Sequence, residues 1–194
     1  MESEKLLIVG LVGVIIVVGL IVVASPYLFL TPTGGSGDGN NNSSGTIAPD
    51  VDLLDLSLEV PDWNLVMSDD SIITMYELHG KFVIIDLMAT WCTFCGSQNS
   101  ELLEIYNTID SDSLVIISLT VDDTETIEMM AEYKTDNALP WEHGLDTSDV
   151  FGDYFSVTSI PTAILIDADG YFRWVHNGVW TESSITLTLS QMMP

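Results

Sequence analysis

The chain has 194 residues, enough for one ordinary domain with extensions. Its formal net charge is −25, from four Lys and Arg residues against 29 Asp and Glu residues, so few basic side chains are available to contact phosphates. Such a surface repels nucleic acid, and no nucleic-acid partner is expected. The acidic surface suits equally a saline habitat, where salt screens its self-repulsion, and an ordinary domain outside the cytoplasm.

The N-terminal part begins with a short polar stretch, residues 1–5, followed by residues 6–30, which contain no charged side chain. At about 1.5 Å per helical residue, a run of this length crosses a hydrocarbon core of about 30 Å, which predicts one N-terminal transmembrane helix. A cleavable signal peptide with small residues before Ser25 is the alternative. The apolar run is, however, longer than the roughly 7–15 residues usual in such peptides.

Lys5 is the one basic residue that flanks this span, and the next along the chain is Lys81. The positive-inside rule therefore predicts a single-pass protein of the cell membrane, with a cytoplasmic N-terminus and an extracytoplasmic globular part. Residues 31–60 form a linker that is first rich in Gly, Ser and Asn and then acidic, a composition that cannot bury a core. Asn41 and Asn42 each fit the N-glycosylation sequon, which is a compositional match only.

Apolar runs alternate with amphipathic stretches in residues 61–194, which predicts an α/β domain. Phe82–Met88 is short, rich in β-branched residues and largely apolar, as in a central strand buried on both faces. A helix is expected to follow, because an apolar stripe runs along its sequence. The stripe comprises Leu102, Leu103, Ile105 and Tyr106. Residues 114–121 predict the next buried strand and residues 124–133 the next helix.

The last third of the domain predicts a hairpin and a helix. Residues 163–166 and 171–175 flank a turn-rich connection, Asp-Ala-Asp-Gly, which is typical of two antiparallel strands. A final helix is expected over about 182–192, with Thr181 or Ser183 as its N-cap.

Cys92 and Cys95 are the only cysteines and form a single Cys-x-x-Cys just after the predicted strand. So short a spacing indicates redox chemistry or half of a metal site, because a structural disulfide usually closes a longer loop. The free amide groups and the dipole of a helix N-terminus favour a thiolate there. Cys92 is therefore the predicted nucleophile, and Cys95, one helical turn on, is the predicted resolving cysteine.

A structural zinc site needs two ligands beyond the cysteine pair, and the only histidines are His79, His143 and His176. None of them forms a close ligand pair with another, so no metal is predicted. The expected redox group is the cysteine pair itself, with no other cofactor.

Four segments together resemble the thioredoxin superfamily and, within it, the membrane-anchored TlpA-like proteins. They cover roughly residues 61–194 in the order seen in the family. The segments are Gly-Lys-Phe-Val-Ile-Ile-Asp at 80–86, Ala-Thr-Trp-Cys-Thr-Phe-Cys at 89–95, Ser-Ile-Pro-Thr at 159–162 and Ile-Asp-Ala-Asp-Gly at 166–170. The resemblance implies a three-layer thioredoxin-like fold with a central mixed sheet, and a thiol–disulfide oxidoreductase that acts on extracytoplasmic proteins.

The resemblance also implies roles for individual residues. Ile160 and Pro161 resemble the pair joined by a cis bond that lies against the cysteines and presents backbone to a substrate. Asp86 resembles the buried acid beneath the cysteines, where desolvation raises its pKa so that it can accept the Cys95 proton. A hydrogen-bonded core carboxylate with no catalytic part is the alternative for Asp86. Trp91 resembles the tryptophan that shields the site and contacts partners, and packing alone is its alternative role.

The chain departs from the family pattern around the cysteines. Gly96 replaces a basic residue, Gln98 stands where TlpA-like proteins often have Glu, and Ser100 replaces a helix-kinking proline. Thr93 and Phe94 match neither the reducing Gly-Pro nor the oxidising Pro-His pattern, so the direction of electron flow stays open. The implied partners are protein thiols and disulfides, with apocytochrome c as one candidate, and a redox partner in the membrane or beyond it.

Two other functions occur on similar folds. Peroxiredoxin-like peroxidases are built around Thr-x-x-Cys, whereas Thr90 lies only two residues before Cys92. Non-enzymatic copper or assembly chaperones are expected to use Cys-x-x-x-Cys with a downstream His. Both remain alternatives to disulfide exchange.

Overall fold

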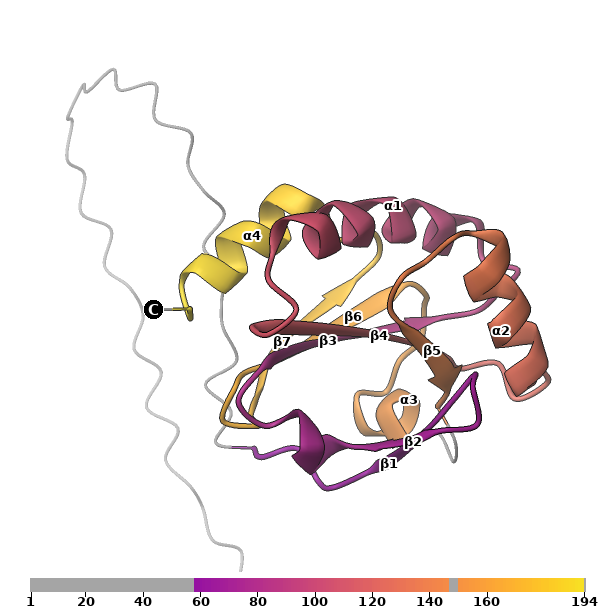
Figure 1. Cartoon of the computed structure of the whole chain (residues 1–194), viewed down its shortest axis with the longest axis horizontal. Helices are drawn as coiled ribbons and strands as arrows, with labels where there is room; N and C mark the ends of the chain where they lie inside the picture. Colours follow the sequence, from indigo (N-terminus) through magenta and orange to yellow (C-terminus); the bar gives the residue numbers. More distant parts are fainter. Residues whose placement is uncertain (1–57, 147–149, 194) are drawn as a thin grey trace, which may run out of the picture. The chain divides into compact units, whose positions relative to one another are not determined.

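A computed structural model of the chain describes residues 58–146 and 150–193 (Figure 1). Within these residues, seven strands form one sheet in the order β2-β1-β5-β4-β3-β6-β7. The strands are β1 (Asn64–Met67), β2 (Ile72–Thr74), β3 (Phe82–Met88), β4 (Leu114–Thr120), β5 (Glu142–Leu145), β6 (Thr162–Ile166) and β7 (Phe172–Asn177). The three central strands β3, β4 and β5 are parallel, and the other neighbouring pairs are antiparallel. The predicted mixed sheet is therefore present.

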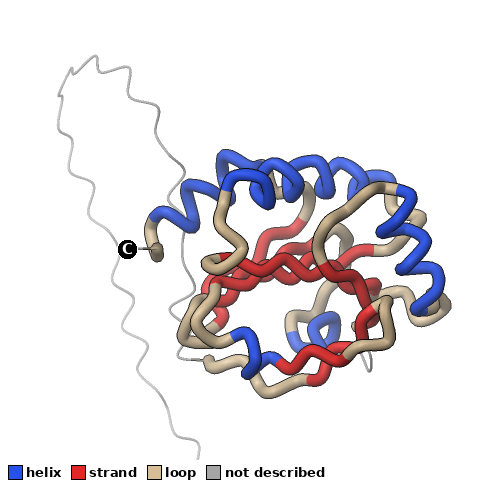
Figure 2. The backbone as a smooth tube through the Cα atoms, in the orientation of Figure 1, coloured by secondary structure: helices blue, strands red, loops and turns tan. Residues whose placement is uncertain are grey.

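Helices lie on both faces of this sheet, as Figure 2 shows for the backbone. They are α1 (Thr93–Thr108), α2 (Ile127–Asp136), α3 (Val150–Tyr154), α4 (Glu182–Ser190) and a short 3₁₀ helix η1 (Met75–Leu78). Side chains of α1 and α4 share one apolar cluster, and α2 packs beside the cysteines on the same face. Side chains of α3 and η1 pack into a different cluster on the opposite face. The predicted three layers are thus two layers of helices with the sheet between them.

Strand β3 contributes to both sides of the core because successive side chains point to opposite faces of a sheet. Ile85 and Leu87 pack with Phe151 of α3. Ile84 packs with Leu102 of α1 on the other side. All seven residues of β3 are buried, as predicted for a central strand.

The helix predicted over 124–133 begins later, at Ile127. Thr126 caps it by accepting a hydrogen bond from the Met129 N–H at 3.4 Å. Thr124 is held outside the helix, because its N–H and its hydroxyl both donate to the Asp122 carboxylate. Competition from such local side-chain bonds explains the shift of the boundary.

The predicted hairpin is formed by β6 and β7, which pair antiparallel. Gly170 closes its turn with a φ of +85°, a conformation that favours glycine. The final helix α4 starts after Thr181, one of the two expected N-caps, although the Thr181 side chain makes no capping bond.

Strands β1, β2 and β5 and helix α3 were not predicted. They are short, and β5 reads Glu-His-Gly-Leu, without a Val, Ile, Thr, Phe, Tyr or Trp to signal a strand. Pairing with the neighbouring strands holds β5 in the sheet instead. Its backbone lies so close to β1 that a Cβ on Gly144 would collide with the backbone oxygen of Val66. The outer part of the sheet therefore depends on a close approach of two backbones.

The predicted transmembrane helix at 6–30 and the linker as far as residue 57 lie outside the described residues. In the part of the chain that the structure describes, none of the helices combines the length and hydrophobicity needed to span a bilayer. Val60 is already buried in the core, so packing begins before the domain start expected at Pro61.

Candidate active site

Cys92 and Cys95 are joined by a disulfide at the N-terminus of α1. Cys92 is the N-cap residue of this helix, and its Sγ accepts a hydrogen bond from the Cys95 N–H at 3.1 Å. Cys92 is 8 % exposed, whereas Cys95 is 0 % exposed. Cys92 is therefore the more exposed of the two cysteines, and its role as the nucleophile, with Cys95 as the resolving cysteine, stays a prediction.

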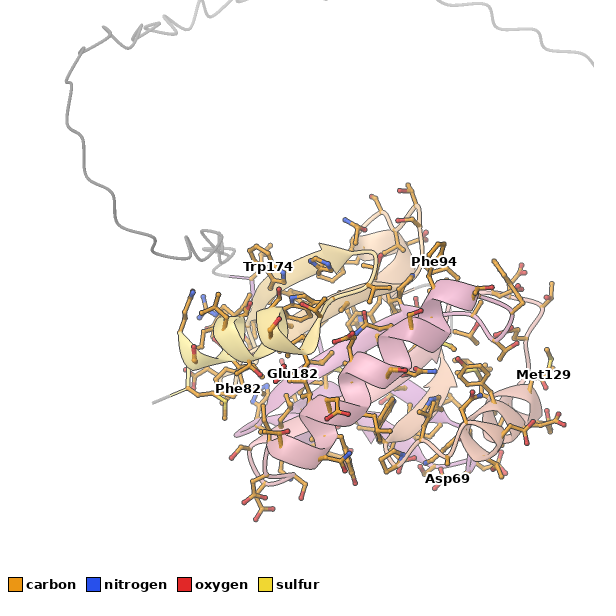
Figure 3. All side chains as sticks on the ribbon, turned by 90° about the horizontal axis from the view of Figure 1, so that it is seen from above. Asp69, Phe82, Phe94, Met129, Trp174 and Glu182 are labelled. Carbon is orange, nitrogen blue, oxygen red and sulfur yellow. A yellow bond between two sulfur atoms is a disulfide. The ribbon has the colours of Figure 1, made fainter. Side chains whose placement is uncertain are left out.

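Two large aromatic side chains flank the disulfide and remain exposed. Trp91 is 68 % and Phe94 69 % exposed, and Phe94 projects at the edge of the domain in Figure 3. The Trp91 indole N–H donates to the Asp122 carboxylate at 2.7 Å, which holds the ring in place. Exposed aromatic surface of this kind is typical of a contact site for another protein.

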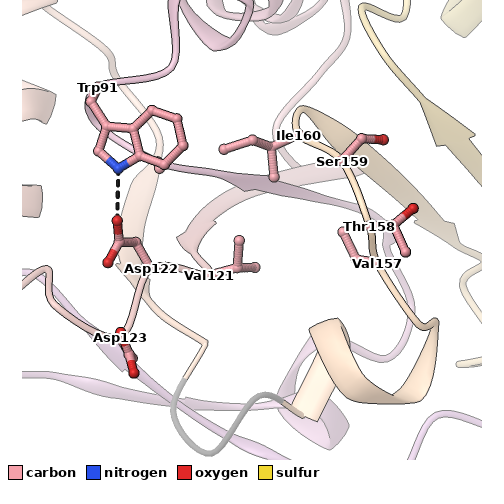
Figure 4. A pocket seen from close by; sticks show the side chains of 9 residues that line it. Trp91, Val121, Asp122, Asp123, Val157, Thr158, Ser159 and Ile160 are labelled. Carbon is pink, nitrogen blue, oxygen red and sulfur yellow. Dashed lines mark hydrogen bonds between the residues drawn. The ribbon is translucent and has the colours of Figure 1, made fainter.

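A groove of about 390 Å³ is lined by Trp91, the residue before Cys92, and Figure 4 draws the side chains that line it. Trp91 and Asp122 form one wall, and residues 157–160 form the other. Ile160 belongs to the cluster that contains both cysteines, and the Ile160–Pro161 peptide bond is cis, as expected. A segment bound in this groove would therefore lie next to the disulfide.

Asp86 lies on β3 beneath this region and is fully buried. Ile84 and Met88 lie two residues before and after Asp86 in β3, so the three side chains point to the same face of the sheet. Ile84 packs with α1 and Met88 packs with the cysteines, so Asp86 faces the side of the sheet that carries the disulfide. Its Oδ2 accepts a hydrogen bond from the Ser118 hydroxyl at 2.9 Å, and its Oδ1 has no partner among the described residues. Burial raises the pKa of Asp86 to about 7, against the opposing effect of the Ser118 bond. Asp86 can therefore gain or lose a proton near neutral pH.

A row of polar residues continues from Asp86 across the sheet. Ser118 of β4 is paired with Asp86, and His143 of β5 is paired with Ser118. The Ser118 oxygen also accepts a bond from the Trp141 indole N–H at 2.9 Å. His143 Nδ1 lies 3.1 Å from the Trp141 carbonyl, which can only accept, so Nδ1 carries the proton. Burial lowers the pKa of His143 to about 4, and its ring is neutral at neutral pH.

Glu125 is a site residue that the sequence did not reveal. It is buried in the loop before α2, where its Oε1 accepts hydrogen bonds from the backbone N–H and the hydroxyl of Thr90. Thr90 lies two residues before Cys92, so Glu125 holds the segment that leads into the disulfide. One glutamate in a chain with 29 acidic residues carries no local signal, and only the folded loop brings it to the site.

Gln98, which stands where TlpA-like proteins often have Glu, is also buried. Its amide donates to the Trp180 carbonyl at 3.2 Å, and its Oε1 accepts from the Trp180 N–H at 2.6 Å. Both ends of the side chain are thus engaged in joining α1 to the segment before α4. In the described ranges, no group of three or more His, Cys, Asp or Glu residues is placed to hold a metal ion.

Comparison with known families matches residues 56–175, more than half of the chain, to the AhpC/TSA family. The chain belongs to the AhpC/TSA family. Among the relatives of this AhpC/TSA protein, the thiol–disulfide oxidoreductase ResA of Oceanobacillus iheyensis is 24% identical over 177 residues, which cover 90% of this chain and 86% of that protein. ResA of Bacillus subtilis is 24% identical over 127 residues, covering 66% of this chain and 70% of the relative.

Solved structures resemble the AhpC/TSA domain in fold. A thiol–disulfide isomerase from Corynebacterium glutamicum superposes with a TM-score of 0.64 at 18% identity, covering 72% of this chain and 98% of that one. StoA from Bacillus subtilis gives a TM-score of 0.57 at 18% identity, covering 68% of this chain and 99% of that one. The predicted thioredoxin-like fold with a mixed sheet is confirmed. The family and its named relatives also confirm the predicted enzyme class, a thioredoxin-like thiol–disulfide oxidoreductase.

Proposed function

We propose that this oxidoreductase is tethered to the cell membrane and exchanges disulfides with extracytoplasmic proteins through Cys92 and Cys95. The observation that carries the exchange is the position of the disulfide. Cys92 caps a helix and is the more exposed of the two cysteines, the preceding Trp91 lines a surface groove, and the fully buried Asp86 faces the same layer of the fold.

The two-step exchange follows from these positions. A substrate thiolate attacks Cys92 Sγ, the Cys92–Cys95 bond breaks, and the Cys95 thiolate takes a proton from Asp86. In the opposite direction the Asp86 carboxylate accepts the Cys95 proton, and the Cys95 thiolate attacks Cys92 in the mixed disulfide and releases the substrate thiolate. A carboxyl group with a pKa of about 7 supports both directions near neutral pH.

Protein segments are the proposed substrates because the groove suits an extended chain. The backbone groups of Ile160 form no hydrogen bond to another described residue, so they are available to pair with a substrate strand. Exposed Trp91 and Phe94 supply apolar contact on either side of the disulfide. Apocytochrome c is the specific candidate that the TlpA-like resemblance supplies.

The proposed location rests on the N-terminal sequence. Residues 6–30 carry no charge, and Lys5 precedes them, which supports a single helix with its N-terminus in the cytoplasm and the domain outside. A redox partner in or beyond the membrane would then renew the cysteine pair after each exchange.

Activity is tested with the full-length protein in mild detergent, using insulin as a model disulfide substrate. Cys92→Ser should abolish exchange, and Cys95→Ser should accumulate a mixed disulfide through Cys92. Ser100→Ala, on the exposed side of α1, is the control and should exchange at the wild-type rate. Equal turnover by wild type and Cys92→Ser would overturn the proposal. Peroxide reduction without protein disulfide exchange would indicate the peroxidase, and stoichiometric copper binding without turnover would indicate the chaperone.

Topology is tested in intact cells. A bulky thiol reagent or a protease added from outside should reach the domain, and the protein should stay with the membranes after a high-salt wash. A soluble form that begins near Ser25 would show instead that the segment is a cleaved signal.

A further inference from the structure

The groove that Trp91 lines continues into a second cavity, and the two form one surface channel. The groove has a volume of about 390 Å³ and the second cavity a volume of about 430 Å³. Val121, Val157 and Thr158 line both, so the two cavities adjoin. The surface channel extends from Trp91 in the groove to Asp153 of α3 in the second cavity.

All the charged side chains that line this channel are carboxylates. Asp122 and Asp123 belong to the groove, where Figure 4 shows them, and Asp153 belongs to the second cavity. No Lys, Arg or His is among the residues that line either part. Asp123 and Asp153 are exposed, and neither carboxylate forms a hydrogen bond or an ion pair with a described residue. These two charges are therefore free to meet a ligand.

The channel also offers apolar and aromatic surface. Val121, Val157 and Ile160 are half-buried in its lining, and Trp91, which precedes Cys92, is 68 % exposed. The stem of a lysine or arginine side chain packs on apolar surface of this kind while its charged end stays near water and carboxylates. The face of an indole ring also attracts a cation. Aromatic ring and carboxylates thus favour the same kind of ligand.

The rest of the described domain has no unpaired basic side chain to neutralise the channel. Lys81, Lys134 and Arg173 are its three Lys and Arg residues, and each forms an ion pair with an aspartate or glutamate. The chain carries a net charge of −25, so a second copy of it would be repelled from the channel. A segment with basic side chains would be attracted.

We propose that the surface channel selects protein segments that carry a Lys or Arg beside the reacting cysteine, and that Asp123 and Asp153 recognise this charge. The inference rests on the proposed disulfide exchange and names its class of substrate. Asp122 has a different part, because one carboxylate oxygen accepts from the Trp91 indole and the other from Thr124. It holds the wall of the channel in place.

Recognition by exposed charges acts mainly on the encounter of the two proteins. Opposite charges speed association, and salt weakens the effect because the screening length falls from about 10 Å at 0.1 M to about 3 Å at 1 M. The bonds that form and break at Cys92 are the same for every substrate. The preference should therefore appear in the second-order rate constant and should depend on salt.

The test compares three peptides that differ at one position. Each contains an intramolecular disulfide, and the residue next to the reacting cysteine is Lys, Gln or Glu. The reduced full-length protein in nonionic detergent reduces each peptide, and acid quenching followed by chromatography gives the rate constant. Dividing by the rate constant of the same peptide with dithiothreitol corrects for its intrinsic reactivity. At low salt the Lys peptide should react about tenfold faster than the Gln peptide, the Glu peptide should be slowest, and about 1 M salt should remove most of the difference.

Asp123→Asn combined with Asp153→Asn keeps the shape of both side chains and removes their charge. The ratio of the Lys to the Gln rate constant should fall from about tenfold to about twofold. Both rates come from one protein preparation, so a misfolded fraction does not alter the ratio. Asp70→Asn combined with Asp169→Asn is the matched control, because it removes two exposed carboxylates that line neither part of the channel. The control should keep the wild-type ratio.

An equal fall of the ratio in both double variants would overturn the proposal, because overall charge would then set the preference. So would a wild-type protein that reduces the three peptides equally fast at low salt. Failure of the proposed function is distinguishable, since wild type would then reduce none of the peptides.

Discussion

The two faces of the central sheet differ, although the same strands build them. On the face toward α3, β3 presents Ile85 and Leu87 to an apolar cluster. On the face toward α1 and α2, the same strand presents Asp86, and β4 and β5 add Ser118 and His143. The comparison shows that one buried strand can support the fold with one set of alternating side chains and hold reactive groups with the other.

The two faces also contribute differently to stability. Burying apolar area contributes about 25 cal/mol for each Å², so the α3 face favours folding. Burying a carboxyl group and an imidazole with unpartnered atoms opposes folding. A polar row that is retained against this cost is expected to serve the chemistry, and three substitutions test that interpretation.

The largest effect is expected on the apolar face. Leu87→Ala should lower the free energy of unfolding by about 2–5 kcal/mol, because it removes buried methyl groups and leaves a cavity. Urea unfolding measures the change, and the exposed Ile72→Ala serves as the control. The protein that remains folded should exchange disulfides at the wild-type rate. A loss of activity without a loss of stability would show that the apolar face also contributes directly to disulfide exchange.

Asp86→Asn is expected to have the opposite effects, namely slower disulfide exchange with stability unchanged or increased. The side chain keeps its shape but loses its proton-accepting group, so resolution of the mixed disulfide should slow severalfold, and by up to about 10²-fold, near neutral pH. Stopped-flow measurement of substrate release gives this rate. Unchanged rates at every pH would assign Asp86 to the core alone.

The same substitution should change how stability depends on pH. Because the pKa of Asp86 is raised from 3.8 to about 7, the native protein between these values holds a proton that the unfolded chain has released. Wild-type stability therefore falls as pH rises through this window, and Asp86→Asn lacks this fall. At about 1.4 kcal/mol per pH unit, the free energy of unfolding of the variant should rise relative to that of wild type by on the order of a few kcal/mol between pH 4 and 7. Urea unfolding of both proteins at pH 4 and at pH 7 measures this change. The same difference between variant and wild type at the two pH values would contradict the raised pKa.

Ser118→Ala should have the smallest effect. It removes the hydrogen bond that lowers the pKa of Asp86, so the midpoint of the pH–rate profile should move upward. The Trp141 N–H also loses its acceptor, which should cost about 1–3 kcal/mol of stability. Trp141→Phe is the control, because it keeps the bond between Ser118 and Asp86. A midpoint that moves equally in both variants would show that the shift comes from repacking.

Much of the site could be predicted because its signals are local. The strand ending at Met88, the cysteine pair and the helix after it lie within one stretch of sequence, where hydrophobicity and spacing are informative. Strand β5 could not be predicted, since its four residues carry no strand propensity and their pairing with β4 and β1 holds them in place. Glu125 was missed for a related reason, because its partner Thr90 is 35 residues away in the chain.

By itself, the sequence determined the cysteine pair, the buried strand beneath it, the family resemblance and the acidic character of the chain. These depend on which residues are present and on spacings of a few positions. Only the tertiary structure decided that Ser118 and His143 align with Asp86 across the sheet and that Glu125 holds Thr90 beside the cysteines. Their chemistry depends on desolvation and on partners supplied by different elements, and both arise only when the helices close over the sheet.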